Sequence, residues 1–190
     1  MKNLQAELRP YLDGDETLLW TGQPKSGILL RNTDFFIIPF SLFWLAFALF
    51  WTYLALGTGG FFGENGLPIF AWLGVPFILV GVVLAFARFP LDARFRDKTI
   101  YGLTEKRILV KTGLFSEEFA SYNLEDLGSL RLREGKNGFG TIALNENDKS
   151  ALMSSGLEWM PGAQPIAHLD MIPNVRKVYQ QILYLQKEQS

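Results

Sequence analysis

Cysteine is absent from the 190-residue chain, and histidine occurs once, as His168. The absence of cysteine excludes disulfide frameworks, thiolate metal sites and cysteine nucleophiles together. A zinc site at His168 would need carboxylates to supply all of its other protein ligands, which is an uncommon donor set. We therefore expect neither a metal site nor a cofactor.

An excess of charge of one sign is also absent, because 18 lysines and arginines stand against 19 aspartates and glutamates. Nucleic-acid binding relies on many phosphate contacts from basic side chains, so no nucleic-acid partner is expected. The adjacent carboxylates of Glu117 and Glu118 would point to opposite faces of a strand, and no nucleophile is spaced to meet a base. We expect no catalytic residues and a protein that is not an enzyme.

Charged residues almost disappear between residues 35 and 87, where Glu64 is the only one. Two apolar runs, 35–57 and 67–87, each exceed the roughly 20 residues with which a helix crosses a hydrocarbon core about 30 Å thick. Residues 58–66 between them are few and Gly-rich, which suits the turn of a helical hairpin. A buried hairpin in a soluble α-helical protein is the alternative, but its helices would carry a polar face. The pattern predicts a transmembrane hairpin.

Lysine and arginine flank both apolar runs but are absent from the loop between them. By the positive-inside rule, both termini lie in the cytoplasm and the loop around Glu64 lies outside, which predicts a multi-pass protein of the cytoplasmic (inner) membrane. Inside the runs, the hydroxyls of Ser41 and Thr52 are expected to bond to their own helix. A transporter or channel component would need polar side chains that face a cavity, so this interpretation is less favoured.

Short alternating segments separated by turn signals follow residue 98. We expect strands at residues 100–103, 107–113, 116–124, 129–134, 139–145 and 165–170. After Pro173, which suits a first helical turn, one helical face carries Val175, Val178, Tyr179, Ile182 and Leu185. Strands closed by one C-terminal helix predict a pleckstrin-homology-like β-sandwich or partly open barrel at residues 88–190. The whole chain is thus predicted to be an α+β membrane protein.

Residues 1–34 are expected to form an N-terminal cytoplasmic segment. Leu4, Leu8 and Leu12 are spaced for a short amphipathic helix, and TLLWTG (17–22) is typical of a strand that could pair with the C-terminal β-domain. The hairpin would then be an insertion after this strand. The linker 89–98 can span at most about 3.5 Å per residue, so it would keep the β-domain near the membrane.

Four stretches of the sequence carry a likeness to a known family. They are DETLLWTGQP (15–24) before the first apolar run, FARF (86–89) at the end of the second, YGLTEKRILVKTG (101–113) and GFGTIAL (138–144). In this order they resemble the bacterial pleckstrin-homology-like proteins that carry membrane spans. The resemblance implies a membrane-anchored bacterial module without catalytic activity, and it brings no known ligand.

Basic residues gather where the second apolar run ends and along the strands that follow. The candidates for contact with lipid headgroups are Arg88, Arg94, Arg96, Lys98, Lys106, Arg107 and Lys111. Near an anionic leaflet each such charge contributes about 1 kcal/mol if it faces the lipid. The alternative is topological, because basic residues flank any span that ends in the cytoplasm.

These features together predict a non-catalytic, membrane-anchored binding or assembly module at the cytoplasmic face of a bacterial membrane. Its partners would be the membrane lipids around the spans and either another protein or a second copy of the chain, because the anchor raises its effective concentration in the membrane plane. An anionic-lipid-sensing module that uses the basic residues is the alternative function.

Overall fold

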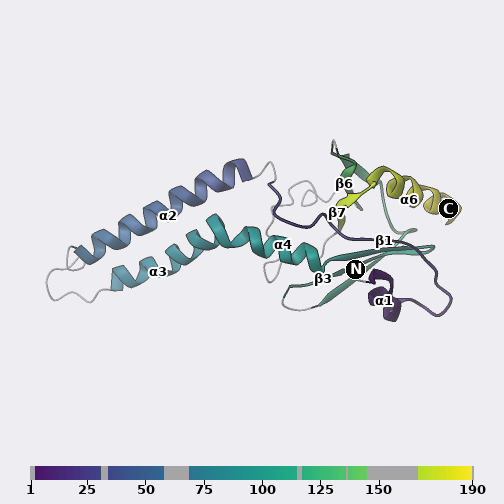
Figure 1. Cartoon of the computed structure of the whole chain (residues 1–190), viewed down its shortest axis with the longest axis horizontal. Helices are drawn as coiled ribbons and strands as arrows, with labels where there is room; N and C mark the ends of the chain where they lie inside the picture. The colour runs from purple at the N-terminus through teal and green to yellow at the C-terminus, as the bar shows by residue number, and fades with distance from the viewer. Residues whose placement is uncertain are drawn as a thin grey trace. The chain divides into compact units, whose positions relative to one another are not determined.

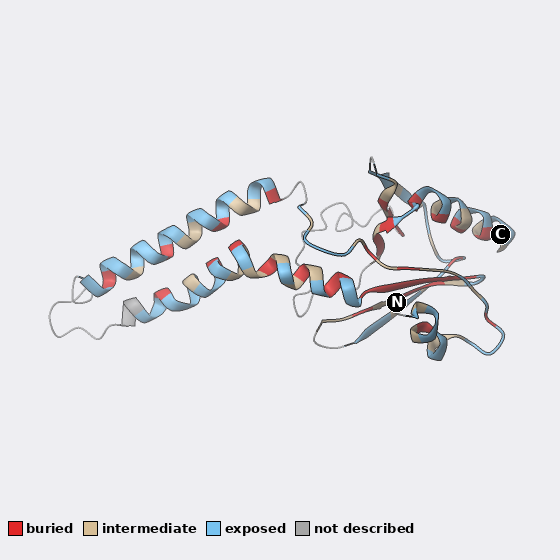
Figure 2. Cartoon of the chain, viewed as in Figure 1, coloured by how far each residue is buried: buried red, intermediate tan, exposed pale blue. Residues whose placement is uncertain are grey.

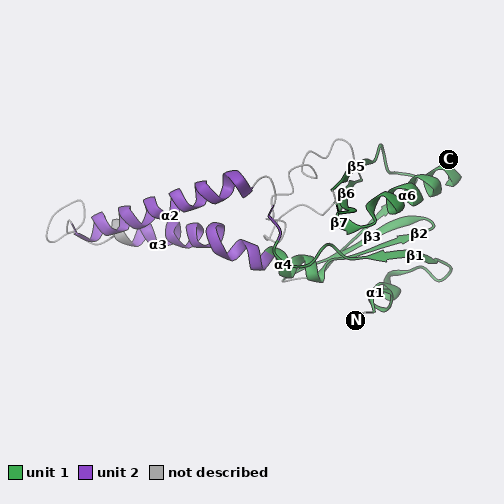
Figure 3. Cartoon of the chain, turned by 45° about the horizontal axis from the view of Figure 1, so that its top comes forward, with its two compact units in different colours: residues 1–28, 92–190 green, residues 29–91 purple. Residues whose placement is uncertain are grey.

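The fold is described by a computed structural model that places residues 3–30, 34–57, 69–114, 117–135, 137–144 and 167–189. These residues form an α+β structure with two apolar helices and two antiparallel sheets, as the sequence predicts. The chain divides into two compact units (Figure 3). Residues 1–28 and 92–190 form the sheet unit, and residues 29–91 form the hairpin unit. The predicted loop 58–66 lies outside the described residues.

The hairpin unit contains α2 (Asp34–Gly57) and α3 (Ile69–Val82), followed by the π-helical turn η2 (Val83–Ala87) (Figure 1). The helix then continues as α4 (Arg88–Lys98), whose last part belongs to the sheet unit. Both α2 and the segment Trp72–Lys98 are long and apolar enough to cross a membrane.

The segment after the second apolar run is helical, so it is shorter than the upper limit that an extended linker would reach. An extended chain spans about 3.5 Å per residue, whereas a helix such as α4 advances about 1.5 Å per residue. Asp92 and Arg96 lie one helical turn apart and form an ion pair at 3.0 Å. An acidic residue four positions before a basic one stabilises a helix, which explains why this charged segment is helical.

The two helices of the hairpin unit pack along a seam that repeats every seven residues. The buried residues of α2 are Asp34, Ser41, Ala48 and Ala55. On the returning helix, Gly74, Gly81 and Arg88 are buried at the same spacing. A repeat of seven keeps one face of each helix toward the other, and small residues let the backbones approach closely. The remaining surface of α2 is largely exposed and apolar (Figure 2).

Three hydrogen bonds engage polar side chains inside the hairpin unit. The hydroxyl of Ser41 donates to the Ile38 carbonyl at 2.9 Å, and that of Thr52 donates to the Ala48 carbonyl at 2.8 Å, so both bond to their own helix as predicted. Between the helices, the Trp44 Nε1 donates to the Phe77 carbonyl at 3.1 Å. The hairpin therefore satisfies its hydroxyls and one indole nitrogen within the unit.

The sheet unit contains a four-stranded and a three-stranded antiparallel sheet within the described residues. The first has the order β1 (Leu18–Gly22), β2 (Ile100–Thr104), β3 (Arg107–Thr112) and β4 (Glu118–Asn123). The second has the order β5 (Arg131–Glu134), β6 (Phe139–Ala143) and β7 (His168–Pro173). Although β1 precedes the hairpin unit and β2 follows it, the two strands pair, with Trp20 opposite Leu103. The hairpin is thus inserted between two neighbouring strands of one sheet.

The C-terminal helix α6 (Val175–Gln189) joins both sheets in one core. Its buried residues are Val175, Val178, Ile182 and Leu185, which confirms the helical face predicted from their spacing. They cluster with Leu103 and Ile108 of the first sheet and with Ile142 and Ile172 of the second. One apolar core therefore holds seven strands and a helix together in the described part of the sheet unit.

The predicted strand at residues 165–170 and the predicted helix start at Pro173 are both displaced. Residues 165 and 166 lie outside the described residues, and β7 runs from His168 to Pro173. Because β7 is an edge strand, it tolerates a proline, which cannot donate to the ladder. Asn174, with φ at 51°, then turns the chain into α6.

The N-terminal segment covers the face of the first sheet opposite to this core. It contains α1 (Leu4–Leu8) and the 3-10 turn η1 (Arg9–Tyr11). Leu8 is fully buried against Gly102, where a Cβ atom would lie 2.8 Å from the Leu8 Cδ1. The Tyr11 ring stacks on Phe119 of β4 with the centroids 4.3 Å apart. Both faces of the sheet are therefore covered by parts of the same chain.

Candidate functional site

Arg88 lies in the seam of the hairpin unit and is 2% exposed. Its Nη2 is 2.5 Å from the Asp34 Oδ1, and its guanidinium lies over the Phe89 ring, 4.6 Å from the centroid. Asp34 is the first residue of α2, where the helix dipole favours a negative charge. The sequence placed Arg88 among the lipid-facing candidates, but the structure turns its guanidinium toward an acidic partner inside the hairpin.

Arg96 is the second buried arginine and is also 2% exposed. It donates to the Asp92 carboxylate at 3.1 Å, to the Lys25 carbonyl at 2.7 Å and to the Gly27 carbonyl at 2.6 Å. The Lys25 N–H in turn donates to the Met171 carbonyl of β7 at 2.9 Å. Arg96, another lipid-facing candidate, therefore fastens the segment after β1 to α4 and contributes no free charge at the surface.

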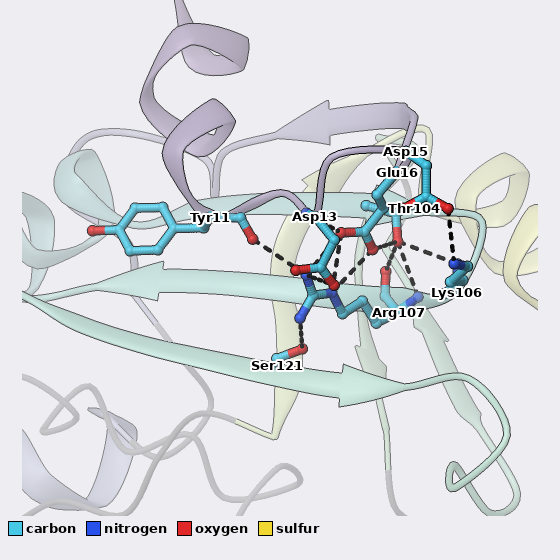
Figure 4. A network of polar contacts seen from close by, with 8 residues as sticks. All are labelled: Tyr11, Asp13, Asp15, Glu16, Thr104, Lys106, Arg107 and Ser121. Atoms are coloured by element: carbon cyan, nitrogen blue, oxygen red, sulfur yellow. Dashed lines mark hydrogen bonds and ion pairs between the residues drawn. The ribbon is translucent and has the colours of Figure 1, made fainter.

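Arg107 begins β3 and binds the N-terminal segment through a carboxylate (Figure 4). Its Nε and Nη2 donate to the two oxygens of Glu16 at 2.9 and 2.8 Å, and the Thr104 hydroxyl donates to the same carboxylate at 2.7 Å. Arg107 also donates to the Asp13 carboxylate at 3.1 Å. The Glu16 side chain is almost fully buried, so this bidentate pair is shielded from water.

The pKa values of this pair follow from the same contacts. The hydrogen bond from Arg107 is the main reason why the pKa of Glu16 falls from 4.5 to about 2, although burial acts in the opposite direction. The Thr104 hydroxyl and the Asp13 N–H lower the pKa further. The hydrogen bond to Glu16 raises the pKa of Arg107. Both groups therefore stay charged at neutral pH and hold the N-terminal segment on the sheet.

The remaining basic candidates lie nearer the surface. Lys111 pairs with Glu117 at 3.3 Å and lies over the Tyr11 ring, and Lys106 forms an exposed pair with Asp15 at 3.7 Å. The Lys98 Nζ donates to the Leu114 carbonyl at 3.2 Å. Lys106 and Lys111 therefore have carboxylate partners, whereas Lys98 is hydrogen-bonded to a neutral carbonyl.

Arg94 and Lys98 are both exposed and form no ion pair within the described part of the chain, although Lys98 donates to the Leu114 carbonyl. The structure brings Lys106 and Arg107 together beside the acidic stretch before β1, but Arg88 and Arg96 each have a separate partner. Sequence reasoning missed the acidic partners Asp34 and Glu16. The signal for Asp34 was its position seven residues before Ser41, at the start of the apolar run.

An apolar cavity of about 450 Å³ also lies in the hairpin unit, between α2 and α3. Its wall includes Trp44, Trp51 and Phe77, with Ala48 and Gly74 among the small residues that line it. None of the described residues that line it is charged, so these residues offer no acid, base or metal ligand. Among the described residues, no three histidine or acidic side chains are grouped to hold a metal ion.

In comparisons with known proteins, no family model, curated protein or solved structure matched the chain.

Proposed function

We propose that the chain is a membrane-anchored, non-catalytic binding or assembly module at the cytoplasmic face of a bacterial membrane. The observation that carries the proposal is the pairing of β1 with β2 across the inserted hairpin. Both ends of the hairpin join neighbouring strands. The sheet unit is therefore tethered to the bilayer by two connecting segments of the chain rather than by one. Such a tether keeps a binding surface at the membrane, where partners in the same plane meet it at high effective concentration.

Insertion of the hairpin unit into a bilayer is supported by its surface. A core helix of a soluble protein is mostly buried, whereas most described side chains of α2 and α3 are exposed, and many of these are large and apolar. Exposed residues include Phe36, Phe43, Tyr53 and Trp72. Lipid tails would cover this surface without the free-energy cost that water imposes on it. The buried small-residue seam is what two packed membrane helices need.

A pleckstrin-homology-like fold for the sheet unit is supported by its order of elements. Four antiparallel strands are followed by three more and by a C-terminal helix that packs into the core between them. This is the order that the sequence resemblance implies, with the hairpin placed between the first and second strands. The buried charged groups Arg88, Arg96 and Glu16 are each engaged in an internal ion pair. Because these charges stabilise the fold, we infer a binding module.

Anionic-lipid sensing has less support as the primary function. Two of the seven basic candidates, Arg88 and Arg96, are buried, and Arg107 is held by Glu16. Only a charge that faces the leaflet contributes to its attraction. A transporter role has less support still, because the hydroxyls of Ser41 and Thr52 bond to their own helix.

The proposal is tested with the tagged full chain in bacterial membranes. After an alkaline carbonate wash, the chain should stay in the pellet, and solubilisation in mild detergent should recover it with a near-stoichiometric partner protein or as a cross-linked dimer. A tagged unrelated two-span protein is the control. Release into the supernatant, or recovery of a monomer without any protein enriched over the control, would overturn the proposal.

A separate arm distinguishes lipid sensing. The full chain is placed in nanodiscs of phosphatidylcholine alone or with phosphatidylglycerol, and amide hydrogen exchange of β2 and β3 is measured at low and high salt. The assembly proposal expects the same exchange in both. Protection that depends on the anionic lipid and disappears at high salt would favour the sensing function.

A further inference from the structure

Among the residues that the structure describes, β4 is an edge of the first sheet, and no strand pairs with its outer side. It pairs with β3 from Glu118 to Asn123 without a bulge. The Leu124 N–H donates to the Lys106 carbonyl at 2.9 Å. This bond identifies which residues of β4 direct their backbone groups toward β3. Because inward and outward backbone groups alternate along an antiparallel strand, the N–H and C=O groups of Phe119, Ser121 and Asn123 face away from β3.

The other sheet edges carry features that discourage pairing with a further strand. The register of β1 shifts between Leu18 and Trp20, which marks a bulge. The edge of β7 accepts a hydrogen bond from the Lys25 N–H at Met171. Strand β5 is only four residues long, and three of them are charged. Natural proteins protect edges in these ways, and β4 has neither a proline nor a bulge.

Exposed carboxylates lie at both ends of β4. Glu118 lies where the strand begins and Glu125 follows its end, whereas the neighbouring Glu117 pairs with Lys111 and the Asp126 carboxylate accepts from the Asn123 amide. Directly after Glu118, Phe119 is 37% exposed and its ring stacks on Tyr11, so an apolar surface lies near the start of the strand. Within the described residues, the edge therefore combines outward-facing backbone groups at Phe119 and Ser121, one aromatic side chain and negative charge at each end, while the Asn123 carbonyl accepts from the Asp126 N–H.

We propose that β4 accepts an extended segment of a partner protein as a fifth strand, and that this segment carries lysine or arginine at both ends. Backbone hydrogen bonds would hold the segment, and its basic ends would meet the carboxylates. A second copy of the chain fits this edge poorly, because antiparallel pairing of two β4 strands would place acidic ends opposite acidic ends. The inference rests on the proposed function and names the chemistry of its partner.

Fluorescence anisotropy with the full chain in detergent tests this inference. The probe is a labelled peptide of alternating valine and threonine with two lysines at each end, and empty micelles give the background. The peptide should bind, whereas a version with glutamates at its ends, or one N-methylated at alternate amides, should bind about tenfold more weakly or not at all. Equal binding of all three peptides, or no binding of the first, would overturn the inference.

Variants of the chain locate the site. Ser121→Pro removes one outward N–H without touching the ladder to β3, so it should abolish binding, while Ser121→Ala should leave it unchanged. Reversing charge in Glu118→Lys with Glu125→Lys should weaken binding about tenfold. Unchanged binding in the proline variant would show that the peptide binds elsewhere. If the peptide does not bind but the chain still recovers its partner from membranes, the inference about β4 is wrong and the proposed assembly function is unaffected.

Discussion

The Arg88 guanidinium lies 2.5 Å from the Asp34 carboxylate, although 54 residues separate the two in sequence. Both belong to the seven-residue seam between α2 and the returning helix. The π-helical turn η2 comes directly before Arg88, and such a turn inserts one residue that changes which way the following side chains point. The two helices are thus joined by an ion pair at one end of the seam and pack through small residues along the rest of it.

Removing one partner of the Arg88–Asp34 pair should destabilise the hairpin more than removing both partners. Arg88→Ala or Asp34→Ala alone leaves a buried charge without its partner and should cost about 3–5 kcal/mol, whereas the double variant should cost less than either single one. Unfolding of the full chain in mixed detergent micelles, followed by circular dichroism, measures this. Arg94→Ala is the exposed control and should change little. Additive costs in the double variant would contradict a direct pair.

The close approach of the helices at Gly81 should tolerate no large side chain. A Cβ atom there would lie 3.2 Å from the Leu45 Cα, which is backbone and cannot move aside alone. Gly81→Leu should therefore lower the stability of the hairpin by about 1–3 kcal/mol in the same assay. Gly57→Leu is the matched control, because nothing lies within 4 Å of a Cβ at that position. Similar stability of the two variants would rule out the tight seam.

Loss of the Arg96 side chain should release the segment that follows β1. Arg96→Ala removes the hydrogen bonds to the Lys25 and Gly27 carbonyls and leaves Asp92 without its arginine. Trypsin should then cut after Lys25 about tenfold faster under native conditions, because local opening becomes easier. Arg94→Ala, on the same helix but exposed, should be cut like the unaltered chain. An unchanged cleavage rate in Arg96→Ala would show that the segment is held by other contacts.

Stability should depend on the Glu16 carboxylate between about pH 4.5 and pH 2. Its pKa is lowered in the folded state to about 2 from 4.5, so its contribution is complete above pH 4.5 and is lost as the pH falls toward 2. A shift of this size corresponds to about 3 kcal/mol. Guanidinium unfolding of the full chain should show Glu16→Gln less stable by this amount near neutral pH, and nearly equal to the unaltered chain at about pH 2.

The control for this titration is Asp15→Asn, because Asp15 is largely exposed and pairs loosely with Lys106. Its stability should follow that of the unaltered chain at every pH. A Glu16→Gln variant whose deficit stays the same at low pH would mean that the carboxylate is not the titrating group.

Much of the fold could be predicted because its signals are local. The near absence of charge between residues 35 and 87, where Glu64 is the only charged residue, identified the apolar helices, and alternation identified the strands after residue 98. The register around Pro173 could not be predicted, because proline suits both a helix start and the end of an edge strand. Only the pairing with β6 and the positive φ of Asn174 decide between the two.

The site was harder to predict, because a basic residue in a sequence does not reveal which acidic residue it meets. Arg88 and Arg96 have the sequence position of residues that face lipid, and their positive charge is what the topology rule counts. Apart from Asp92, four residues before Arg96, their partners are Asp34 and the carbonyls of Lys25 and Gly27, which lie 54 to 71 residues earlier in the chain. Contacts between residues that are far apart in the sequence produce no local sequence pattern from which they could be predicted.

Labelling of single cysteines in intact bacterial cells tests the central claim, membrane anchoring by the hairpin, most directly. The chain has no cysteine, so each introduced thiol reports one position. With a membrane-impermeant maleimide applied to spheroplasts, Glu64→Cys should be labelled at once, and Glu188→Cys only after the membrane is broken. Labelling of both positions only after lysis, with the chain recovered in the soluble fraction, would contradict the account.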